Sequence, residues 1–251
     1  MKTIQIIFLA LFFSASLAIA QDTLYVYKAG AVAYKSVIST VDSITFQKVY
    51  PPAPTVTDFD GNVYHTVVIG TQTWMVEDLK TTHYRDGSPI ANVTDNGAWV
   101  ANTTGAWCDY NNDPAMGTKY GHLYNWYAVA NASNLAPAGW HVPTFAEWTI
   151  LANYLGGDAA AGGKLKETGT VNWTAPNYGA TNETGFTSRP GGYRSFSDGT
   201  FGLINGYVNI WGSDAADASR GYYVYMQSDN SFLNRGAYYK GCGFTVRCIK
   251  D

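Results

Sequence analysis

The sequence predicts an α+β fold in which two helices pack against short antiparallel strands and much of the chain lies in loops. The chain has 26 Gly in 251 residues and 15% aromatic residues, a composition typical of a turn-rich fold with a large core. Apolar residues recur with helical spacing in two places, around 123–130 and 144–155. Short β-branched or alternating runs, typical of strands, lie towards both ends of the chain.

The first twenty residues predict a cleavable signal peptide. Lys2 precedes an apolar run over residues 4–13, and residues 18–20 form an A-x-A cleavage signal. This run is shorter than the ~20 apolar residues that span a bilayer, and no Cys follows it to accept a lipid. We expect an exported protein (periplasmic, cell-surface or secreted) whose mature chain begins near Gln21 and has no transmembrane segment.

Residues 21–50 predict a short β-meander leader and the start of a linker. β-branched and aromatic runs at 25–27, 31–34 and 43–46 are separated by turn residues. The Pro-rich stretch 51–54 is typical of a stiff linker. We therefore place the boundary near residue 50 and the main domain at 51–251.

The main domain opens with strand signals and continues with a loop-rich stretch. Asp60-Gly61 predicts a hairpin turn before a strand at 63–69, and the β character continues at 73–76. Residues 84–120 and 162–200 are rich in turn residues and predict long loops.

Two helices are expected between these loops. Residues 123–130 carry one apolar face, formed by Leu123, Trp126, Tyr127 and Ala130. The second helix begins at Thr144, which forms a capping box with Glu147, and it ends at Gly156-Gly157. Its apolar stripe is formed by Trp148, Leu151, Ala152 and Leu155.

Strands return in the last fifty residues. Runs at 222–226 and 243–249 have strand character, and no internal repeat is evident. In the final strand we expect Phe244, Val246 and Cys248 to point inward and the residues between them to point outward.

Charge and motifs exclude several classes of function. The net charge is −3 with no basic cluster, which argues against nucleic-acid binding. The sequence contains no G-x-S-x-G, H-E-x-x-H or C-x-x-C motif. The four histidines lack metal-ligand spacing, and we interpret them as hydrogen-bonded structural residues: His65, His83, His122 and His141.

One polar stretch is a candidate calcium site. Asp109, Asn111 and Asp113 place oxygen side chains at alternate positions, as at the start of a calcium loop. Pro114 stands where that loop has Gly, and Tyr120 where it has Glu. The alternative is a loop whose side chains hydrogen-bond their own backbone.

Loop aromatics are a candidate glycan-binding surface. Trp173 and Tyr178 lie among Asn, Thr and Pro, and Tyr193 and Arg194 follow in a Gly-rich segment. A flat ring beside amides and a guanidinium can stack on a sugar and hydrogen-bond its hydroxyls. The alternative is that these side chains cover the core of the loop itself.

The three cysteines allow one disulfide and leave one thiol unpaired. An extended strand separates Cys242 from Cys248 by about 20 Å, whereas a disulfide needs Cα atoms within about 7 Å. Cys108 would therefore pair with one of the two C-terminal cysteines.

Several motifs, in order, resemble the Fibrobacter succinogenes major paralogous domain. They are YGHLYNWYAV at 120–129, AGWHVPT at 138–144, GGYR at 191–194 and GFTVRC at 243–248, together with Cys108 and YNND at 110–113. The resemblance covers about residues 56–251 and implies the cell envelope or exterior of gut-type bacteria. Residues 22–46 resemble a short leader segment found before such domains in exported Bacteroidetes proteins.

This family is in turn similar to formylglycine-generating enzymes. The stretch VPTFAEW at 142–148 resembles their helix start, and the terminal GFTVRC resembles their G-F-R-C. The resemblance implies a C-type-lectin-like fold, and Cys248 as the partner of Cys108 with Cys242 free. Those enzymes carry a catalytic cysteine pair shortly before the terminal Cys, and residues 211–241 contain no Cys.

We therefore expect a non-catalytic, exported interaction module without an obligatory cofactor, binding a glycan or an envelope protein. One alternative is a divergent oxidase or hydrolase on the same scaffold. The other is a purely structural surface protein.

Overall fold

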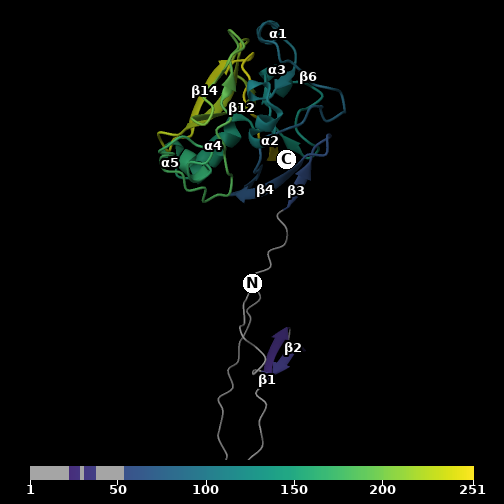
Figure 1. Cartoon of the computed structure of the whole chain (residues 1–251), viewed down its shortest axis with the longest axis vertical. Coiled ribbons are helices and arrows are strands. Elements are labelled where there is room, and N and C mark those ends of the chain that lie inside the picture. Colours follow the sequence, from purple (N-terminus) through teal and green to yellow (C-terminus); the bar gives the residue numbers. More distant parts are fainter. Residues whose placement is uncertain (1–22, 29–30, 38–53) are drawn as a thin grey trace, which may run out of the picture. The chain divides into compact units, whose positions relative to one another are not determined.

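The computed structural model describes residues 23–28, 31–37 and 54–251, and the chain divides into two units, Met1–Pro51 and Pro52–Asp251 (Figure 1). In the first unit, β1 (Thr23–Lys28) and β2 (Ala31–Val37) pair antiparallel, and they include the runs at 25–27 and 31–34 where strands were expected. The expected strand at 43–46 and the predicted signal peptide lie outside the described residues.

The second unit is α+β, as predicted. Its largest sheet has the strand order β3-β4-β5-β15-β9, in which each neighbouring pair is antiparallel. The strands are β3 (Thr55–Thr57), β4 (Val63–Ile69), β5 (Gln72–Met75), β15 (Ile249–Lys250) and β9 (Trp140–His141). The turn at Asp60-Gly61 joins β3 to β4, with Gly61 at φ 83°, so the predicted hairpin is confirmed.

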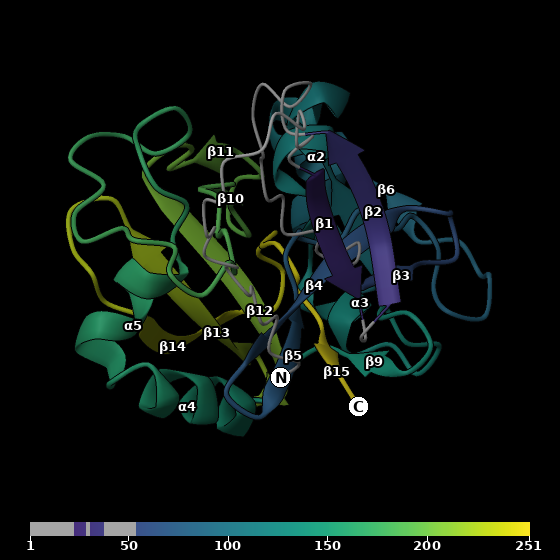
Figure 2. The ribbon, with the colours of Figure 1, turned by 90° about the horizontal axis from the view of Figure 1, so that it is seen from below.

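A second sheet orders β12 (Tyr207–Ala215), β13 (Arg220–Gln227) and β14 (Asn234–Tyr239) antiparallel. Helices α4 (Phe145–Tyr154) and α5 (Asp158–Leu165) lie beside this sheet in Figure 2, and α4 contacts β12 and β13. One sheet face joins the core under these helices through Val208, Ile210, Val224 and Met226. Because side chains alternate along a strand, Trp211, Tyr223 and Tyr225 lie on the other face.

Helix α4 confirms the second predicted helix. The Thr144 side chain accepts from the Glu147 N–H at 3.2 Å, and Glu147 accepts from the Thr144 N–H at 2.7 Å. Trp148, Leu151 and Ala152 are buried, as the stripe predicts. The helix ends before Gly156-Gly157, which have φ 96° and 91°.

The first predicted helix is mostly wrong. Residues Leu123–Tyr124 form strand β8, and only the single turn α3 (Trp126–Val129) is helical. Asn125 separates them because its side chain accepts from the Ala128 N–H at 3.0 Å and caps α3.

The predicted loops contain short elements. The stretch 84–120 holds β6 (Ala91–Asn92), α1 (Asn96–Ala101), β7 (Ala106–Cys108), a 3₁₀ turn η2 (Tyr110–Asn112) and α2 (Pro114–Tyr120). Strands β6, β7 and β8 form a small sheet with a parallel β6-β7 pair. In the second loop, β10 (Tyr193–Arg194) pairs with β11 (Phe201–Gly202).

Residues 242–250 run through the interior and connect several elements. Backbone hydrogen bonds link Gly243 to β10, Phe244 to β8, Thr245 to β12, Val246 to Leu79 and Cys248 to Met75 in β5. The predicted alternation is wrong, because residues 242–249 are all buried on both sides of the segment. A strand that is covered on both faces has no outward positions.

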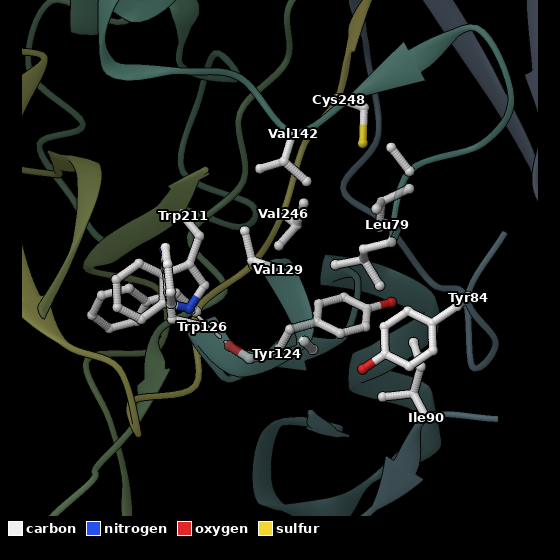
Figure 3. Packing of buried hydrophobic residues seen from close by; sticks show 14 of the residues in the cluster. Leu79, Tyr84, Ile90, Tyr124, Trp126, Val129, Val142, Trp211, Val246 and Cys248 are labelled. Atoms are coloured by element: carbon white, nitrogen blue, oxygen red, sulfur yellow. Dashed lines mark hydrogen bonds between the residues drawn. The ribbon is translucent and has the colours of Figure 1, made fainter. Parts of the chain in front are cut away.

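The central core packs around Tyr124. Figure 3 shows its ring between the Trp126–Trp211 pair and Tyr84, and the Trp211 indole donates to the Tyr124 carbonyl at 2.8 Å. Within the described residues, no helix is long and apolar enough to cross a membrane.

Candidate functional site

The structure does not bring the four predicted glycan-binding residues together on a surface. Trp173 has 1% of its surface exposed, and its indole donates to the Ser188 carbonyl at 3.0 Å. Its ring lies 5.3 Å from the Lys166 ammonium. Trp173 therefore covers the core beneath its loop, the alternative considered for this residue, and does not face a ligand.

Arg194 is also interior. Its guanidinium lies 4.5 Å from the Trp99 ring and 4.8 Å from the Phe201 ring, and it donates to the carbonyls of Gly199 and Val93. It therefore holds the 193–202 hairpin against the loop before α1. Tyr193 beside it is half-buried.

Of the predicted glycan-binding set, only Tyr178 is exposed, with 60% of its surface open to solvent. Its backbone is fixed, because its N–H donates to the Ser228 carbonyl and its carbonyl accepts from Lys166.

Two of the three candidate calcium residues, Asp109 and Asp113, have protein partners. Asp113 caps α2 by accepting from the Ala115 N–H at 2.9 Å, and Asp109 pairs with His122 Nδ1 at 2.7 Å. Asn111 lies in the left-handed region with φ 54°. In the part of the chain that the structure describes, no three His, Cys, Asp or Glu side chains gather as a metal site would require.

The predicted Cys108–Cys248 disulfide is not present in the structure, so this prediction is not supported. All three cysteines are buried free thiols. Cys108 packs in the cluster with Trp99, whereas Cys242 and Cys248 pack in the central cluster, so separate cores hold the two proposed partners. Burial raises the pKa of Cys108 and Cys242 to about 12 each, and raises that of Cys248 further.

The histidines have the hydrogen-bonded environment expected of structural residues. Each bonds a carboxylate within 2.8 Å: His65 with Glu77, His83 with Asp60, His122 with Asp109, and His141 with both Glu147 and Asp251.

A groove lies between α4, α5 and the start of β14. Its volume is about 690 Å³, within the range of ordinary ligand sites. We call it the α4–β14 groove; it is lined by Phe145, Thr149, Asp158, Ala159, Phe232, Leu233, Asn234 and Arg235.

Arg235 organises the polar side of the groove. Its guanidinium pairs with Asp158 Oδ2 at 2.6 Å, donates to Thr149 Oγ1, and lies 5.3 Å from the Phe145 ring. The Asp158 carboxylate belongs to the first turn of α5, where the helix dipole favours negative charge. These contacts hold two opposite charges at fixed positions in the groove.

Phe232 and Asn234 supply the remaining groups. The Phe232 side chain is 46% exposed while its backbone is fixed, because its carbonyl lies against Gly162 of α5, where any Cβ would overlap it. Asn234 Nδ2 is buried and has no hydrogen-bond partner among the described residues.

Sequence reasoning missed this groove. Its residues come from three segments that meet only in the folded chain, and one of them, α5, lies partly in a stretch interpreted as loop. The exposed Phe232 beside Asn230 and Asn234 resembles the aromatic-and-amide pattern used to select Trp173, and it was the usable signal.

Comparison with known families gives one match. Residues 67–250 match the model of the Fibrobacter succinogenes major domain. The chain belongs to this family. No curated protein and no solved structure matches it.

The family match contains every residue of the α4–β14 groove. It begins within β4, whereas the sheet of the same folded unit also includes β3 at Thr55–Thr57. In this member of the Fibrobacter succinogenes major domain family, the folded unit therefore starts before the matched span.

Proposed function

We propose that this protein is an exported, non-catalytic binding module that holds a glycan in the α4–β14 groove. The observation that carries the proposal is the combination of groups in that groove. An exposed aromatic ring, Phe232, and an ordered Asp158–Arg235 pair line a volume of about 690 Å³.

These groups match the chemistry of a sugar. The Phe232 ring can stack on the apolar face of a pyranose, while Asp158 accepts from its hydroxyls and Arg235 donates to them. The partners are fixed by α5 and β14, so little side-chain entropy is lost on binding.

The non-catalytic part of the proposal is supported by the thiols. Cysteine oxidation requires an accessible thiolate, and burial raises the pKa of all three thiols. We also propose that this α+β unit has a C-type-lectin-like fold. It is supported by the capping box at Thr144 and by the terminal GFTVRC segment, which resemble formylglycine-generating enzymes.

A glycan array probed with the full chain tests this function, followed by calorimetry of the strongest ligand. We expect Phe232→Ala to weaken binding by about tenfold, because truncating an aromatic at the centre of a site costs on the order of 1–2 kcal/mol. Phe59→Ala is the matched control, since Phe59 is 59% exposed and lies outside the groove.

If both variants lose the same glycan affinity, or if neither loses any, the groove is not the glycan site. Binding of an envelope protein with no glycan bound would favour the alternative partner, and binding of neither would favour a structural role.

A further inference from the structure

A second cavity lies between the residues after β5, the end of α2 and the loop before β10. Its volume is about 100 Å³, and none of its lining residues belongs to the α4–β14 groove. A water molecule takes up about 30 Å³ in the liquid, so this cavity has room for one small polyatomic group.

A buried ion pair lines the cavity. Arg247 Nε pairs with Asp78 Oδ1 at 2.7 Å, and the two side chains are 1% and 2% exposed. Arg247 Nη1 donates to the Phe186 carbonyl at 2.5 Å, whereas Nη2 has no protein acceptor among the described residues. An arginine has five N–H donors, so this guanidinium can still bind an acceptor in the cavity.

The cavity wall has an excess of positive charge. It carries Lys80, Lys119, Arg189 and Arg247 against Glu77 and Asp78. Of these, Arg189 pairs with Glu167 outside the cavity, and Glu77 accepts from His65.

Neither Lys80 nor Lys119 has a carboxylate partner in the described part of the chain. Their ammonium groups lie 5.9 Å from the Tyr64 ring and 4.9 Å from the Tyr120 ring, respectively. Two lysines without counter-ions at one cavity attract an anion.

The backbone at the cavity is held in uncommon conformations. Thr187 has φ 56°, which is costly for a β-branched residue, and the Asn182 side chain bonds its N–H at 2.8 Å. Gly121 has φ 81°, and a Cβ there would lie 2.8 Å from Asp78 Cβ. Strain that the surrounding structure maintains is typical of binding sites.

We propose that this cavity is an oxyanion site that binds one carboxylate, sulfate or phosphate group, either as a free ion or as part of a larger acidic ligand. Arg247 supplies a fixed donor at the base, and Lys80 and Lys119 supply charge at the opening. Charge-assisted bonds of this kind are stronger than neutral hydrogen bonds, and the volume limits the site to one such group.

Titration of the ¹⁵N-labelled full chain with inorganic phosphate, and separately with acetate, tests the proposal by NMR. We expect saturable shifts of the amides of Lys119, Gly121 and Thr187, and weaker binding at higher KCl concentration. A tighter response to phosphate would indicate a tetrahedral group, and a tighter response to acetate a planar one. A glucuronate titration in parallel separates a free ion from an acidic sugar.

Lys119→Gln and Lys80→Gln should each lower the affinity for the more tightly bound of the two anions by about threefold to tenfold. Each substitution removes one positive charge near the bound group. Lys250→Gln, an exposed lysine that does not line the cavity, is the control and should leave the affinity unchanged. Absence of saturable shifts at these amides, or equal weakening by all three variants, would overturn the proposal.

Discussion

Lys166 connects the long loop after α5 to the second sheet, and its removal is the sharpest test of how that loop is held. The side chain is fully buried, and its ammonium donates to the carbonyls of Tyr178, Gln227 and Asn230 at 3.0, 2.8 and 2.8 Å. Lys166→Met keeps the length of the chain and removes all three bonds.

The expected cost follows from two opposing contributions. Three hydrogen bonds from a charged donor contribute about 1.5–3 kcal/mol each. Against this, burial lowers the pKa of Lys166 from 10.5 to about 8, which corresponds to about 3 kcal/mol of lost solvation. We therefore expect Lys166→Met to lower the free energy of unfolding by about 3 kcal/mol at neutral pH.

The same residue predicts a pH dependence. Because the pKa of Lys166 is lower in the folded chain than in the unfolded chain, the unfolded chain binds more protons between about pH 8 and 10.5. The free energy of unfolding should thus rise with pH across that window in the native protein. This rise should be absent from Lys166→Met.

Guanidinium unfolding followed by tryptophan fluorescence measures both effects. Lys164→Met is the control, because Lys164 makes a half-exposed pair with Glu183 at 3.0 Å and should contribute less than about 1 kcal/mol. If both variants unfold at the same denaturant concentration, or if the pH profiles coincide, Lys166 does not fasten the loop.

Two further predictions concern local contacts. Glu147→Ala removes the capping box and the 2.8 Å bond to His141. It should lower the free energy of unfolding by about 1–2 kcal/mol. An unchanged melting temperature would argue against the cap. Gly117→Ala places a Cβ on the Asp109 carboxylate, so it should break the bond to His122 and lower the free energy of unfolding by about 1–3 kcal/mol. The broken bond should be seen by NMR as changed chemical shifts of the His122 ring. Ala115→Gly, on the same short helix, is the control, and native His122 ring shifts in Gly117→Ala would contradict the prediction.

The sequence predicted those elements whose signals are local. The capping box at Thr144 and the hairpin turn at Asp60-Gly61 each lie within a few residues, and both are present. The segment 123–130 carries helical spacing, but the Asn125 cap and the pairing of Leu123–Tyr124 with β7 divide it. Spacing alone could not reveal that tertiary pairing.

Helix α5 shows why other elements were missed. Its Gly162 and Gly163 indicate a loop by propensity, yet both are required because α5 lies directly against the backbone of residues 179 and 231–233. The same limit applies to the candidate site. Trp173 and Arg194 were selected as loop residues, but these loops cover the core and their large side chains point inward.

The path of residues 242–250 bears on how the molecule reaches its native state. Strands β5, β8, β9, β10 and β12 all form backbone bonds to this segment, and these bonds join positions far apart in the sequence. Such long-range pairing slows folding. During synthesis, the contacts that join these strands to the segment can therefore form only after residue 242 has been added.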